Sequence, residues 1–259
     1  MKDGFLSIAT PPNLPRIKRI YCAFLVAGLL SRIIDVSVPI FDTSEQEETH
    51  HTTGPRAYYK PGDLYVKIST ICSYSTGLRE RMTSRIDAPF HAGTHVDAPL
   101  HRIENGTSLD DIPLETFVGK MRVVDLSRRA QGLAITGKDL EDDAGSGSIE
   151  RLLIKTGWFR NLGKPKYYDS SSPHLTLDAV EWMVAKGVKL LATDFMPDPP
   201  RALSLPVQRK ILESGICILA NLANLDQISK RDVDIAALPV KIAGAEGSPC
   251  RAIVIEDDS

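Results

Sequence analysis

The chain has 259 residues, a formal net charge of −2 at neutral pH and 42% hydrophobic residues. A chain of this length can bury a sizeable core as one large domain or two small ones. Its 31 basic and 33 acidic residues nearly cancel, so the charge gives no indication of a nucleic-acid partner. The four cysteines form no Cys-x-x-Cys pair, which is typical of reduced, mostly buried thiols in a cytoplasmic protein.

The N-terminal segment differs from the rest of the chain. Residues 1–31 are predicted to be an extension and residues 32–259 one domain, because no Pro/Ser/Gly-rich or charged linker divides the latter. Lys18 and Arg19 precede an apolar run over residues 20–30, which resembles the start of a secretory signal. The run is too short to span a bilayer, and no clean cleavage site follows it. We therefore expect a cytoplasmic protein with no membrane partner, and secretion through this segment is the alternative. If the run is not a signal, we expect an added helix that packs on the domain or on a neighbouring subunit, or a disordered extension.

Strand and helix patterns alternate along the domain. Strands are predicted over residues 33–38, 64–74, 83–90, 121–126, 149–155, 188–193, 216–222, 240–243 and 252–255. Helices are predicted over residues 136–144, 176–187 and 204–215, with Val180, Met183 and Val184 on one face of the second helix. Such alternation favours an α/β fold with a covered sheet. His50 and His51 lie in a polar stretch that predicts a solvated loop, with a contribution to the active site as the alternative.

Histidines are concentrated in residues 90–101, Phe-His-Ala-Gly-Thr-His-Val-Asp-Ala-Pro-Leu-His. This segment holds three of the six histidines of the chain and one carboxylate: His91, His95, His101 and Asp97. Imidazole nitrogens and carboxylate oxygens are ligands for zinc or manganese. Gly93 and the strand-forming residues after it predict a turn followed by an extended segment, in which residues 95, 97, 99 and 101 share one face. The histidines and Asp97 would then meet at a metal or acid/base site, with His91 joining across the Gly93 turn.

The pattern His-x-Gly-Thr-His-x-Asp-x-Pro-x-His resembles the signature of the cyclase family of metal-dependent hydrolases, which includes bacterial kynurenine formamidase and isatin hydrolase. The resemblance runs from about residue 33 to the end of the chain. It implies that His91, His95 and Asp97 are metal ligands and that His101 is the acid/base residue. It also implies a single α/β domain of the swivelling β/β/α type, with a mixed or barrel-like sheet flanked by helices. Family members form dimers or tetramers, so we expect a homodimer or homotetramer.

Three positions depart from the kynurenine formamidase pattern. Gln208 and Ala220 stand where those enzymes have a histidine and a glutamate that complete a two-metal site. Alanine cannot coordinate a metal, whereas Gln208 can bind one through its amide oxygen. This set resembles the one-metal arrangement of isatin hydrolases and predicts one Mn²⁺ or Zn²⁺ per chain. Lys60 replaces an aromatic residue that contacts substrate in the formamidases.

These features predict a hydrolase that cleaves an amide or lactam C–N bond in a small aryl substrate. The metal would polarise the carbonyl group and activate a water, and His101 would act as general base and then protonate the leaving nitrogen. Phe90, Lys60 and Trp158 are the predicted substrate contacts, with simple packing as the alternative role of Trp158. The alternatives are a kynurenine formamidase acting on N-formylkynurenine in tryptophan catabolism, a hydrolase or dehydratase of another small carbonyl compound, and a metal-depleted small-molecule binding protein. His174, just before the second helix, is predicted to be structural.

Overall fold

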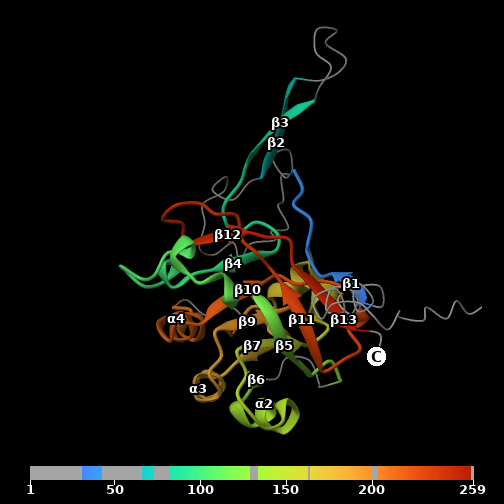
Figure 1. Cartoon of the computed structure of the whole chain (residues 1–259), viewed down its shortest axis with the longest axis vertical. Helices are drawn as coiled ribbons and strands as arrows, with labels where there is room; N and C mark the ends of the chain where they lie inside the picture. The colour runs from blue at the N-terminus through green and yellow to red at the C-terminus, as the bar shows by residue number, and fades with distance from the viewer. Residues whose placement is uncertain are drawn as a thin grey trace, which may run out of the picture.

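The computed structural model describes residues 31–42, 66–72, 82–128, 134–162, 164–199 and 204–257. Within them, nine strands form one mixed sheet in the order β1-β13-β11-β5-β7-β9-β10-β4-β12 (Figure 1). These strands are β1 (Ser31–Asp35), β4 (His95–Asp97), β5 (Val118–Asp125), β7 (Arg151–Lys155), β9 (Leu190–Thr193), β10 (Cys217–Ala220), β11 (Asp232–Ala236), β12 (Gly247–Pro249) and β13 (Ile253–Asp257). Two strand pairs lie outside this sheet: β2 (Lys67–Cys72) with β3 (Thr83–Asp87), and β6 (Ala134–Ile135) with β8 (His174–Leu175). The helices of the described part are α2 (Gly137–Ala144), α3 (Leu177–Lys186) and α4 (Pro206–Glu213).

The four central strands of the sheet are parallel, and an α-helix lies between each of them and the next one in the chain. Strands β5, β7, β9 and β10 pair in parallel, and α2, α3 and α4 connect them in turn. Parallel neighbours need such crossover connections. The helices pack against one another on one side of the sheet (Figure 1). The α/β alternation predicted from the sequence is confirmed.

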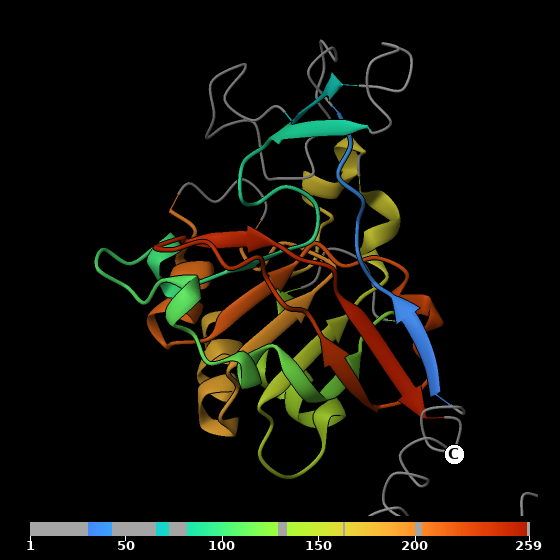
Figure 2. The same cartoon turned by 45° about the horizontal axis from the view of Figure 1, so that its top comes forward.

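Strand β7 shows that both faces of the parallel centre are buried. All five of its residues are buried, and their side chains alternate between the two faces. Leu152 and Ile154 pack in the hydrophobic cluster beneath the helices, whereas Leu153 belongs to a second cluster. That second cluster includes Val233 of β11 and Val254 of β13, because the sheet curls and its antiparallel flank folds over this face (Figure 2). The predicted mixed, barrel-like core flanked by helices is therefore confirmed.

The helix ends follow from local sequence signals. Thr136 and Asp139 form a reciprocal capping box at the start of α2, as the sequence predicts for Thr136. Gly187 ends α3 with φ of 82°, a left-handed conformation that glycine adopts readily. Val184 was expected on the buried face of α3, but it is exposed. Its position one residue after Met183 turns it away from the stripe that packs on the sheet.

Several strand predictions need correction. Strand β11 was not expected, and residues 240–243 are not a strand although their composition suggested one. Pro239 forms an isolated β-bridge with Cys250. The chain then turns, and Ala245 N donates a backbone hydrogen bond to Ile242 O within this turn. The edge position next to β4 is taken by β12 instead. Long-range pairing overrides local β-propensity here.

Cys217 and Cys250 are free thiols. Cys217 is buried and Cys250 half-buried, and burial raises the pKa of each thiol to about 12. Both therefore stay protonated and unreactive near neutral pH. These properties agree with the buried thiols expected from the sequence.

Some sequence predictions fall on other parts of the chain. The apolar run over residues 20–30, His50, His51 and Lys60 lie outside the described residues. None of the described helices is long and apolar enough to cross a membrane. The pair β2–β3 projects from the rest of the described fold (Figure 1).

Candidate metal centre

The turn before β4 is built by the glycine and threonine of the histidine motif. Gly93 has φ of 64°, and a Cβ there would lie 2.9 Å from Ile40 Cγ1 and 3.0 Å from Val38 O. Glycine is required because both the backbone conformation and the space exclude a side chain. The Thr94 hydroxyl accepts a hydrogen bond from Val38 N (2.7 Å) and donates one to Asn221 O (2.6 Å). These contacts connect the turn to two distant segments and fix how the chain enters β4.

Strand β4 carries two of the motif side chains on one face. It lies between β10 and β12, and His95 and Asp97 are two residues apart, so their side chains share a face and are both buried. The extended segment was expected to continue to His101, but it ends at Asp97. A 3-10 helix (Pro99–His101) follows, because Pro99 suits the first position of a helical turn. This tight turn, and not a period-two strand, brings His101 back to the site.

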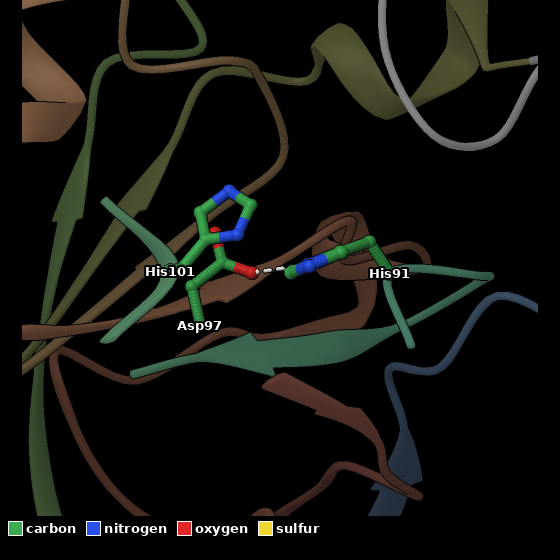
Figure 3. Close-up of side chains that lie close together, drawn as sticks. All are labelled: His91, Asp97 and His101. Carbon is green, nitrogen blue, oxygen red and sulfur yellow. Dashed lines mark hydrogen bonds and ion pairs between the residues drawn. The ribbon is translucent and has the colours of Figure 1, made fainter. Parts of the chain in front are cut away.

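The Asp97 carboxylate lies at the centre of the site. His91 Nδ1 is 2.8 Å from Asp97 Oδ1, the bond drawn dashed in Figure 3, and His95 Nε2 is 3.3 Å from the same oxygen. One ligand atom from each of His91, Asp97 and His101 lies within 4.8 Å of the others. The rings of His91 and His101 have centroids 4.2 Å apart. His95 lies beside this triad and is not part of it, although the resemblance placed His95 and not His101 among the ligands.

The hydrogen bond of His95 favours a metal-binding tautomer. His95 Nδ1 lies 2.9 Å from the carbonyl oxygen of Gly93, which can only accept a hydrogen bond. In the neutral ring Nδ1 therefore carries the proton, and the lone pair of Nε2 faces Asp97 Oδ1. Two electron-pair donors that face each other need a positive centre between them, which is a proton on Nε2 in the metal-free protein or a metal ion in its place, and histidine ligands commonly donate their second ring nitrogen to a backbone carbonyl. The nitrogen and oxygen donors around Asp97 thus fit a divalent ion such as zinc or manganese.

The side chains of the site differ in pKa, and therefore in which of them are charged at neutral pH. Burial alone would raise the pKa of Asp97, but interactions with His95 and His91 outweigh burial and hold that pKa well below its usual range. Burial likewise opposes protonation of His91, yet Asp97 and Glu246 raise the His91 pKa above its ordinary value. Burial lowers the pKa of His101 to about 4, despite the opposing charge of Asp97. At neutral pH, therefore, Asp97 is ionised and His101 is a neutral base.

Gln208 reaches the site from the first turn of α4. Its side chain is buried, and its Nε2 donates to Asp97 Oδ2 at 3.3 Å. Its Oε1, the atom predicted to bind a metal, accepts a hydrogen bond from Arg102 Nε at 2.8 Å. Asp198 accepts backbone hydrogen bonds from Val207 N (2.8 Å) and Gln208 N (3.0 Å), which fixes the start of the helix. The structure thus places Gln208 beside Asp97, with its amide nitrogen facing the carboxylate, and metal binding through the amide oxygen stays a prediction.

Ala220 is the direct partner of His95 in the β10–β4 register. Paired residues of neighbouring strands project from the same face. The methyl group of Ala220 therefore lies next to His95, at the position where the kynurenine formamidase pattern has a glutamate. Alanine offers no ligand atom there.

Two predicted substrate contacts lie in the described part of the chain. Phe90 is half-buried in the turn that precedes His91. Trp158 is 2% exposed, packs in the cluster beneath the helices, and donates from Nε1 to Tyr167 O at 3.1 Å. This burial supports the packing role of Trp158 over stacking on a substrate. His174 is half-buried in β8 and does not belong to the group of potential ligands around Asp97.

Sequence reasoning missed three residues near the site. Glu246 Oε1 lies 3.4 Å from His91 Nε2, Arg102 binds Gln208, and Asp198 anchors α4. Arg102 follows His101 directly, so its position next to the motif was an available signal. Glu246 and Asp198 lie in connecting segments far from the motif in sequence and carry no local signal of their own.

Comparisons with known proteins concern the family and the fold of the chain. A profile for the family described as "Putative cyclase" matches residues 30–197. A kynurenine formamidase of Bacillus thuringiensis subsp. konkukian (strain 97-27) is 33% identical over 171 residues, which is 66% of this chain and 78% of that protein. The structure of isatin hydrolase A from Ralstonia solanacearum superposes with a TM-score of 0.75 at 26% identity, covering 95% of this chain and 99% of that one. A structure described as a predicted metal-dependent hydrolase from Bacillus stearothermophilus has the same fold, with a TM-score of 0.67 at 24% identity and coverage of 88% and 99%. The chain therefore belongs to the cyclase family, and it is a hydrolase of that family.

Proposed function

We propose that the protein hydrolyses an amide or lactam C–N bond in a small aryl substrate, with one divalent metal ion per chain. The observation that carries this proposal is the pairing of Ala220 with His95, which leaves donors for one ion around Asp97 and none at the position of the second-metal glutamate. This arrangement supports isatin hydrolase-like lactam opening. The kynurenine formamidase relatives support cleavage of N-formylkynurenine as the second candidate.

The residues of the chain suit the proton transfers of such a reaction. A divalent ion held by His91, His95 and Asp97 would polarise the scissile carbonyl and favour deprotonation of water. His101 is neutral at neutral pH, so one of its ring nitrogens can accept the proton of the attacking water. The imidazolium then donates that proton to the leaving nitrogen. The ionised Asp97 balances part of the positive charge.

The deciding experiment combines metal analysis with two substrates. Protein purified without added metal is analysed for metal content, loaded with Mn²⁺ or Zn²⁺, and assayed with isatin and N-formylkynurenine in parallel. We expect about one ion per chain and opening of the isatin ring. About two ions with release of formate would favour the kynurenine formamidase alternative instead, and absence of both metal and turnover would favour the binding-protein alternative.

Two variants test where the metal binds. Asp97→Asn keeps the shape of the side chain but removes its charge, so it should abolish metal binding and turnover together. Asp110→Asn is the matched control, because Asp110 is a half-buried carboxylate bonded to Ser108 and Gly244 outside the site. Equal metal content in wild type and Asp97→Asn would refute the proposed location.

A further inference from the structure

Three residues form a hydrogen-bonded chain that ends on the central carboxylate. Arg102 Nε donates to Gln208 Oε1 at 2.8 Å, and Gln208 Nε2 donates to Asp97 Oδ2 at 3.3 Å. The other Asp97 oxygen, Oδ1, faces His91 and His95. Each oxygen of the carboxylate is thus approached by different groups, and Gln208 is the partner of Oδ2.

The orientation of the Gln208 amide follows from its two neighbours. A guanidinium group can only donate hydrogen bonds, and an ionised carboxylate can only accept them. The amide must therefore turn its oxygen to Arg102 and its nitrogen to Asp97. The backbone of Gln208 is fixed separately by Asp198, so the remaining freedom of this residue is rotation of its side chain.

We infer that Arg102 is a positioning residue for the metal site, which acts through Gln208 to hold the Asp97 carboxylate. This inference rests on the proposed metal-dependent function. Without Arg102, the amide oxygen of Gln208 loses its donor, and the side chain is free to swing away from Asp97 Oδ2. Asp97 would then lose the donor that orients it.

Because Arg102 is positively charged, the direction of the change in metal affinity on its removal tests the inference. Removal of a positive charge near a cation site should tighten metal binding if charge alone matters. Loss of a residue that orients a metal ligand should instead weaken metal binding, typically about 10- to 100-fold. The two explanations therefore predict opposite changes in metal affinity.

The test measures Mn²⁺ affinity by competition with a chelator, in the absence of substrate. We expect Arg102→Met to bind Mn²⁺ about tenfold more weakly than wild type, and Arg102→Lys, which keeps a charged donor, to restore most of the affinity. Arg209→Met is the matched control, because Arg209 is next to Gln208 on α4 but pairs with Glu213 on the exposed surface. Its affinity should equal that of wild type.

A double variant separates action through Gln208 from an independent effect. In Gln208→Ala the link to Asp97 is already absent, so adding Arg102→Met should cause no further loss of affinity. The visible spectrum of the Co²⁺-loaded protein, which reports coordination geometry, should change in the same way in both single variants and should remain that of wild type in Arg209→Met.

The outcomes distinguish this inference from the substrate assignment. Equal or tighter Mn²⁺ binding in Arg102→Met, or additive losses in the double variant, would overturn the role of Arg102 and leave the proposed function standing. Failure of the wild type to hydrolyse isatin and N-formylkynurenine would refute the proposed substrates. The Mn²⁺ affinities of the variants are measured without substrate, so they would still test the positioning role of Arg102.

Discussion

Gly247 is paired with Asp97 in the β12–β4 register and lies against the His91 ring, and its substitution by alanine should damage the candidate site selectively. A Cβ at this position would lie 2.8 Å from His91 Cε1, 3.3 Å from His91 Nδ1 and 3.0 Å from Val96 O. Ordinary contact begins at 3.4 Å, so the closest approach is too short by about 0.6 Å. Either the His91 ring or the β4–β12 pairing must give way.

The magnitude follows from these contacts. The His91 Nδ1 to Asp97 Oδ1 bond is 2.8 Å long, and a displacement of about 0.6 Å would stretch it beyond normal hydrogen-bond length. Overpacking of a well-packed site costs about 1–3 kcal/mol of unfolding free energy. We therefore expect Gly247→Ala to lower the melting temperature modestly and to weaken metal binding at least about tenfold.

The control is a glycine of the same connection that does not touch the site. Gly244 has φ of 70°, and a Cβ added to it would have no neighbouring atom within 4 Å. Gly244→Ala therefore adds backbone strain of about 1–2 kcal/mol without contact to His91. Thermal unfolding and Mn²⁺ affinity are measured for both variants. Wild-type affinity in Gly247→Ala, or an equal loss in both variants, would refute the reasoning.

Three further predictions concern the chemistry and support of the site. His101→Ala should reduce turnover about 10²- to 10⁴-fold with little change in metal affinity; if metal binding is lost as well, His101 is a ligand and not the base. Because the pKa of His91 is raised above 6.5 in the metal-free protein, a metal ion must displace its proton. Metal affinity should therefore fall as the pH drops through the raised pKa. The stability of the metal-free protein has the opposite trend: the contribution of the His91–Asp97 pair is present below pH 6.5 and is lost as the pH rises through the raised pKa. Calorimetric titration at several pH values checks the first trend, and a pH-independent affinity would contradict it. Asp198→Ala removes two acceptors from the start of α4 and should cost about 1–2 kcal/mol of unfolding free energy, measured by denaturant titration; an unchanged midpoint would show that the helix start is held by other contacts.

The sequence alone was sufficient for features that depend on neighbouring residues. Gly93 sets the turn before β4, Thr136 caps α2, and Gly187 ends α3, because each acts through its own dihedral angles or through residues a few positions away. The α/β alternation and the long histidine motif likewise indicated the fold class and the family. These signals are local, so they can be read without knowledge of the packed structure.

The tertiary structure decided which residues surround Asp97. Gln208 lies 111 positions from Asp97 in the chain, and its amide orientation depends on Arg102, whose contact with it no sequence pattern encodes. Glu246 reaches His91 only because β12 takes the edge of the sheet next to β4, and no strand was predicted over residues 247–249. Strand order and side-chain contacts between distant segments depend on how the whole core packs, and local propensity determines them only weakly. The motif therefore indicated the candidate ligands as a group, whereas only the folded chain showed which side chains contact them.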